Sequence, residues 1–120
     1  MLAESYNSFQ KVYIAVGYTD LRKGIDGLSQ LVGAKYQLNP YEKDILFLFC
    51  GKKCDRIKAL LWEGTGFLLL YKRLEDGTFA WPRSGDEAAA LSEDQFHLLM
   101  DGLNPFPRKK IRETRPKKVL

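Results

Sequence analysis

The chain has 120 residues, 45% of them hydrophobic, which is enough for the core of one domain and too few for two. No apolar run approaches the roughly 18–20 residues of a membrane span, and the N-terminus has no signal-peptide pattern. These features exclude a membrane protein and predict a cytoplasmic one.

The net charge of +4 is distributed unevenly along the chain. Residues 105–120 hold seven Lys/Arg and one Glu, which gives +6, whereas residues 1–104 hold twelve Lys/Arg and fourteen Asp/Glu, which gives −2. The sequence therefore predicts a single domain over residues 1–104 and a basic tail over residues 105–120. Such a tail is either a solvated end or an arm that binds nucleic acid, and with three prolines we expect it to be disordered alone.

The first half of the chain predicts a strand, a helix and a second strand. Residues 12–16, VYIAV, are apolar and mostly β-branched, which indicates a strand. Thr19 or Asp20 can cap a helix over residues 21–35, whose apolar residues fall on one stripe. Residues 45–50, ILFLFC, form a short apolar run that is typical of a strand buried on both faces.

The second half predicts two hairpins and a helix. Residues 56–62 and 67–73 indicate paired strands, because Gly64-Thr65 between them suits a two-residue turn. Asp76-Gly77 is a hairpin signal that leads to a strand over residues 79–81. Ser92 and Gln95 form a capping-box pattern that opens a helix ending near residue 104. The fold class is then α+β, an antiparallel β-meander of four to five strands with two helices packed on one face.

The turn at Gly64-Thr65 sets the register of the first hairpin and assigns its side chains to two faces. Arg56 lies opposite Arg73 on the first face. That face holds Arg56, Lys58, Leu60, Trp62, Phe67, Leu69, Tyr71 and Arg73. The second face is almost entirely apolar, so we expect it to meet the helices. The cations either solubilise an ordinary wet face or bind a polyanion that relieves the repulsion between the two arginines.

A second pair of cations, Arg22 and Lys23, falls in the first turn of the expected helix. Free N–H groups at a helix N-terminus together with two cations make an anion site. The alternative is that both side chains turn toward Asp20, Asp26 or solvent.

Catalytic and metal-binding patterns are weak. No glycine-rich loop matches a phosphate-binding signature, and the carboxylates fall mainly at turns and caps, where each has a structural role. His97 is expected near a polar side of its helix. Cys50 and Cys54 are a close pair without the further ligands that a zinc site needs. We therefore expect no enzyme, no cofactor and no metal.

Three runs of the sequence together resemble one known family. They are TDLRKG-x-DGL, G-x-x-x-DRIK-x-L-x-W-x-G-x-G and YKRLE-x-G-x-F-x-WP, within residues 12–104. The chain resembles the TnpB accessory proteins of the insertion sequence 66 family of bacterial transposable elements, which are distinct from the RNA-guided nucleases of the same name. The resemblance implies a protein that is encoded beside a separate transposase, is needed for efficient transposition and has no catalytic residues to assign. The family pattern does not call for Cys50 and Cys54.

Three functions are compatible with these features. The first is a non-catalytic transposition factor that binds DNA and bridges it to the transposase. Its candidate residues are Arg22, Lys23, Lys52, Lys53, Arg56, Lys58, Tyr71, Lys72, Arg73, Arg108, Lys109, Lys110 and Arg112. The second is a protein-interaction module that docks on the transposase through Trp62, Phe67 and Leu69. The third, an RNA-cleaving enzyme of the toxin type, lacks a convincing proton donor and acceptor near Tyr71.

Overall fold

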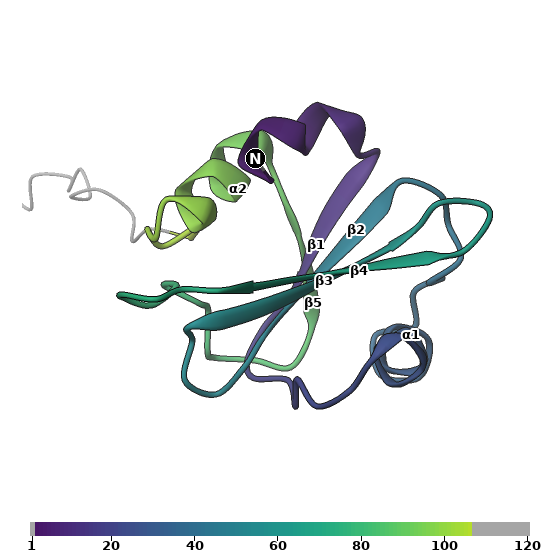
Figure 1. The fold of residues 1–120 in the computed structure, drawn as a ribbon, viewed down its shortest axis with the longest axis horizontal. Coiled ribbons are helices and arrows are strands. Elements are labelled where there is room, and N and C mark those ends of the chain that lie inside the picture. Colours follow the sequence, from purple (N-terminus) through teal and green to yellow (C-terminus); the bar gives the residue numbers. More distant parts are fainter. Residues whose placement is uncertain (1, 107–120) are drawn as a thin grey trace, which may run out of the picture.

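The computed structural model of the protein describes residues 2–106, and its core is one five-stranded sheet between helices (Figure 1). The elements in chain order are the 3-10 helix η1 (Ala3–Ser8), β1 (Lys11–Ala15), α1 (Ile25–Ala34), β2 (Ile45–Cys50), β3 (Arg56–Trp62), β4 (Phe67–Arg73), β5 (Ala88–Leu91) and α2 (Glu93–Met100). None of the helices in this part of the chain is long and apolar enough to cross a membrane.

The sheet is mixed, with strand order β4-β3-β2-β1-β5. Strand β1 pairs with β2 in parallel, and the remaining pairs are antiparallel. The α+β class is confirmed, but the purely antiparallel meander is wrong. A parallel pair needs a long crossover connection, and α1 lies in the connection between β1 and β2.

The two helices lie on opposite faces of the sheet, so the expectation that both pack on one face is also wrong (Figure 1). Leu28 and Val32 of α1 pack on the face that includes Phe47, Phe49 and Leu60, which we call the α1 face. On the other face, the α2 face, α2 packs its buried Phe96 and Leu99 against a cluster that includes Leu46, Leu48 and Ile57. Tyr6 of η1 completes this second layer, since its ring lies 5.6 Å from that of Phe96.

The β3–β4 hairpin follows the predicted register at every position. Trp62 is paired with Phe67 and Arg56 with Arg73, and the Glu63 N–H donates a 2.9 Å hydrogen bond to the carbonyl of Gly66. Gly64 has φ +88°, which is the positive value that the first central residue of a two-residue type II′ hairpin turn requires. The capping box of α2 is confirmed as well: Ser92 Oγ accepts from the Gln95 N–H, and the Gln95 side chain accepts from the Ser92 N–H.

The strand predicted over residues 79–81 is absent. After β4 the chain leaves the sheet, and the Phe79 N–H donates to the Cys54 carbonyl at 2.7 Å instead of pairing with β4. Phe79 and Trp81 are buried in the α2-face cluster, and Trp81 Nε1 donates to the Ala15 carbonyl at 2.9 Å. The apolar residues of this segment therefore anchor a connection that crosses the sheet, and the last strand is β5.

Candidate nucleic-acid interface

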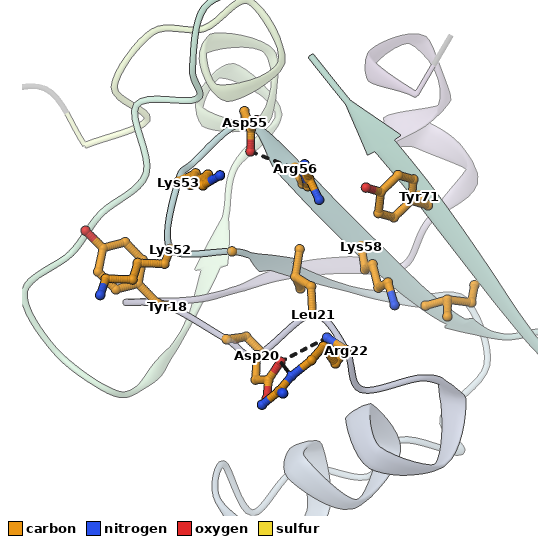
Figure 2. Close-up of a pocket in the computed structure, with 13 residues that line it drawn as sticks. Tyr18, Asp20, Leu21, Arg22, Lys52, Lys53, Asp55, Arg56, Lys58 and Tyr71 are labelled. Atoms are coloured by element: carbon orange, nitrogen blue, oxygen red, sulfur yellow. Dashed lines mark hydrogen bonds and ion pairs between the residues drawn. The ribbon is translucent and has the colours of Figure 1, made fainter. Parts of the chain in front are cut away.

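A groove of about 800 Å³ opens on the α1 face at one edge of the sheet (Figure 2). Three segments line it: residues 18–22 after β1, residues 51–58 at the β2–β3 turn and the start of β3, and Leu69 and Tyr71 of β4. Strands β1 and β2 are parallel, so the loops that follow them leave the same edge of the sheet. The mixed topology thus brings together two basic segments that are thirty residues apart in the sequence.

Specific contacts hold these segments against one another. The Thr19 N–H donates to the Cys50 carbonyl at 2.8 Å, and Lys58 Nζ donates to the Lys23 carbonyl at 3.0 Å. A Cβ atom at Gly51 would lie 3.3 Å from Leu21 Cδ1, so a glycine lets the two loops approach closely. These contacts hold the loop that follows β1 against the β2–β3 turn and the start of β3.

Two of the cations in the groove are paired with carboxylates. The Arg22 guanidinium donates from Nη2 to Asp20 Oδ2 at 2.8 Å and from Nε to both carboxylate oxygens of Asp20. The backbone N–H of Arg22 also donates to Asp20 Oδ1, at 3.0 Å. These hydrogen bonds from the Arg22 side chain, followed by the one from its backbone, lower the pKa of Asp20 to about 2. The same contacts raise the pKa of Arg22. Arg56 lies 3.5 Å from Asp55.

The three lysines of the groove have no such partner. Within residues 2–106, no carboxylate lies within 4 Å of the amino group of Lys52, Lys53 or Lys58. Lys52 and Lys53 are exposed on the β2–β3 turn, and Lys58 is half-buried on β3 beside Tyr71. The groove therefore carries uncompensated positive charge in a concave surface, an arrangement that attracts anions.

The candidate residues divide clearly between this groove and other places. Arg22, Lys52, Lys53, Arg56, Lys58 and Tyr71 line it, whereas Lys23 does not and only accepts a hydrogen bond from Lys58 through its backbone carbonyl. Arg73 shares the face but pairs with Glu75 at 2.9 Å, and Lys72 lines a second cavity on the α2 face. Arg108, Lys109, Lys110 and Arg112 lie outside the described residues.

The helix expected over residues 21–35 begins later than predicted, so the two cations do not lie in its first turn. Of the two alternatives for Arg22, the structure shows the side chain turned toward Asp20. Helix α1 begins at Ile25 with Gly24 as its N-cap, so Arg22 and Lys23 lie in the preceding turn. The Asp20 side chain accepts from the Arg22 backbone and guanidinium and stabilises that turn in place of a longer helix. Arg22 reaches the groove from a loop.

The sequence analysis did not assign several groove residues to this site, among them Tyr18, Asp20 and Asp55. The two carboxylates had been assigned to turns and caps, where Asp20 does act. Tyr18 directly precedes the TDLRKG motif, but nothing in its sequence context indicates that its ring is exposed beside the lysines.

The three predicted partner-binding residues are all half-buried on the hairpin face: Trp62 and Phe67 lie at the end away from the groove, and Leu69 lines the groove. Phe67 and Leu69 pack against the α1-face cluster, and Tyr41 places its ring 5.2 Å from the rings of both Trp62 and Phe67. This aromatic cluster is a compact, partly exposed patch.

Cys50 and Cys54 are free thiols buried in the α2-face cluster. Burial, and then the neighbouring Cys54, raise the pKa of the Cys50 thiol. In the part of the chain that the structure describes, no group of three or more His, Cys, Asp or Glu side chains lies close enough together to hold a metal ion.

The fold and the groove define a small α+β protein with a basic, concave face. A family model described as IS66 Orf2-like protein matches residues 10–110. The chain therefore belongs to the IS66 Orf2-like family. The members of this family are accessory proteins of an insertion sequence, and their role is associated with transposition.

Two curated relatives come from Sinorhizobium fredii. The protein y4jC is 38% identical to this chain over 109 residues, which cover 91% of this chain and 92% of y4jC. The protein y4hO is 36% identical over 94 residues, which cover 78% of this chain and 81% of y4hO. Both are described as uncharacterized proteins. No solved structure matches the chain.

Proposed function

We propose that the protein is a non-catalytic transposition factor that binds nucleic acid through the basic groove. The observation that carries this proposal is the set of three lysines, Lys52, Lys53 and Lys58, that line one groove without a carboxylate partner among the described residues. The successive phosphates of a nucleic acid can pair with several such cations at once. Each phosphate that a lysine neutralises releases counterions from the nucleic acid, and this release favours binding.

The arginines support the same function in a different way. Arg22 and Arg56 are held beside the lysines by Asp20 and Asp55, so their positions are set before a ligand arrives. An ordered guanidinium loses less entropy when it binds a phosphate than a free one does. The groove thus combines lysines that have no carboxylate partner among the described residues with arginines that have one.

A non-catalytic role is favoured by the residues present in the groove. Asp20 and Asp55 are both beside arginines, and the low pKa of Asp20 makes it a poor base. His97, on α2 at the other face, lies 3.8 Å from Glu93. A toxin-type RNA cleavage would require a matched proton donor and acceptor beside Tyr71, whereas each of the two groove carboxylates lies beside an arginine.

The second candidate is docking on the transposase of the same element. It is favoured by the aromatic cluster of Tyr41, Trp62 and Phe67, since partly exposed aromatic side chains are enriched at protein interfaces. The cluster and the groove lie at opposite ends of the same hairpin face, so one molecule has room for both partners.

The test is binding of the purified full-length chain to labelled DNA and, separately, to the transposase, at several salt concentrations. We expect DNA affinity that falls steeply with salt and that is lost when Lys52 and Lys53 are changed to Glu. A chain that binds the transposase but no nucleic acid at low salt would favour the second candidate and reject the first.

A further inference from the structure

Two exposed tyrosines lie among the cations of the groove. Tyr18 is 44% exposed and Tyr71 is 52% exposed, and both line it. In Figure 2 they stand on opposite sides of the groove, with Lys53, Arg56 and Lys58 between them. The two aromatic rings therefore flank the cations on one concave surface.

The two rings are held by ordered backbone. Tyr71 is on β4 directly opposite Lys58 of β3, so its direction is set by the register of the hairpin. Tyr18 lies just before the Thr19 hydrogen bond to Cys50, and the Arg83 guanidinium is 5.7 Å from the centre of its ring. That cation adds positive charge beside an aromatic surface.

Exposed aromatic rings in a basic groove suit a ligand with free base faces. In a duplex, each base face is covered by its neighbours, and only the edges of the bases can be reached. In an unpaired strand the faces are free, and proteins that bind such strands combine a positive groove with aromatic side chains on which bases stack. The lysines alone would serve either form, whereas stacking on the tyrosine rings is available only to the unpaired form.

We propose that the groove binds an unpaired stretch of nucleic acid, with bases stacked on Tyr71 and Tyr18 and phosphates bound by Lys52, Lys53 and Lys58. The inference rests on the proposed function and narrows its ligand to single strands. Both DNA and RNA present this chemistry, and the 2′-hydroxyl is the group that distinguishes them.

The experiment measures the affinity of the full-length protein by fluorescence anisotropy for four labelled probes. They are oligothymidylate, oligouridylate, a DNA duplex, and an abasic deoxyribose-phosphate strand that has the same charge as oligothymidylate but no bases. Each probe is tested with the wild type, Tyr71→Ala, Tyr71→Phe and Tyr18→Ala. Tyr41→Ala is the matched control, because Tyr41 is also exposed but does not line the groove. Thermal melting checks that each variant is folded.

We expect each groove Tyr→Ala change to weaken oligothymidylate binding by about fivefold or more, the loss typical of one stacked base. Tyr71→Phe and Tyr41→Ala should bind like the wild type, and no tyrosine change should alter affinity for the abasic strand. Tighter binding of oligothymidylate than of oligouridylate would assign the ligand to DNA, and the reverse order to RNA.

The inference is overturned if folded Tyr→Ala variants bind oligothymidylate like the wild type, or if they lose affinity equally for the abasic strand. Binding in that case depends on the phosphates alone, and the proposed function stands. If none of the four probes binds the wild type even at low salt, the proposed function fails together with the inference.

Discussion

Arg56 lies directly opposite Arg73 across the β3–β4 pair, with both side chains on the α1 face. Like charges in this relation destabilise a sheet by roughly 0.2–1 kcal/mol. Arg56 Nε lies 3.5 Å from Asp55 Oδ1, and Arg73 Nη2 lies 2.9 Å from Glu75 Oε1. Neither carboxylate bridges the two arginines. The face therefore carries a local electrostatic cost that an anionic ligand would remove.

Changing Arg56 and Arg73 together to Gln should leave the free energy of unfolding unchanged or raise it by about 0.2–1 kcal/mol, because a repulsion is removed. Affinity for nucleic acid and transposition frequency should both fall. Thermal melting, a binding titration and a transposition assay measure the three quantities. A variant that no longer folds would mean that the arginines support the structure, and a stable, fully active variant would mean that this end of the face is only solvated surface.

The β3–β4 hairpin was predictable residue by residue because its register depends on local chemistry. Gly64 supplies the positive φ of the turn, and the alternation of Arg56, Lys58 and Leu60 with apolar residues fixes which side chains share a face. The capping box that begins α2 was also predictable, because Ser92 and Gln95, which form it, are only three residues apart in the sequence. The two candidate clusters could therefore be named, although their meeting in one groove could not.

The errors arose where distant contacts decide the structure. The parallel pairing of β1 with β2 requires a crossover that carries α1 over the sheet, and the fully buried β2 alone does not specify the direction of that pairing. Strand β5 consists of three alanines and Leu91, and alanine is a poor strand former, so only pairing with β1 specifies it. Asp76-Gly77 signals a hairpin, but burial of Phe79 and Trp81 in the α2-face cluster directs the chain elsewhere.

Asp20 should show an unusual titration. Its pKa of about 2 in the folded protein lies below the ordinary value of 3.8, so its ion pair stabilises the fold above pH 3.8, and this contribution is lost as the pH falls toward 2. Carboxyl ¹³C NMR should give a midpoint near 2 in the wild type. In Arg22→Gln the midpoint should rise and remain below 3.8, because the backbone N–H of residue 22 still donates. A midpoint that stays near 2 in this variant would show that other groups hold the carboxylate.

The cysteines should behave as buried core residues. A thiol reagent should modify Cys50 and Cys54 only as fast as the protein unfolds, because both are buried and the pKa of Cys50 is raised. Replacing both with Ala should cost roughly 0.5–1.5 kcal/mol each, as for other small losses of buried volume, and leave nucleic-acid binding intact. Rapid modification of the folded protein, or stoichiometric zinc that is lost in the double variant, would contradict this role.

The basic tail should add affinity without selectivity. Residues 107–120 carry seven Lys/Arg and one Glu, and each phosphate contact contributes about −0.9 to the slope of log affinity against log salt on duplex DNA. Deleting these residues should flatten the slope and weaken binding to all sequences alike. An unchanged slope would show that the tail makes no contact with the nucleic acid.

The most direct measurement compares two triple variants with the same net charge. In the first, Lys52, Lys53 and Lys58 are changed to Gln. In the second, the exposed lysines Lys11, Lys35 and Lys43, which do not line the groove, are changed to Gln. The salt dependence of single-strand binding is then measured for both variants and the wild type. The account predicts that the groove variant loses about 2 from the magnitude of the slope, at roughly 0.7 for each lysine, while the control variant keeps it. Equal losses in the two variants would contradict the account, because general positive charge and not the groove would then bind the nucleic acid.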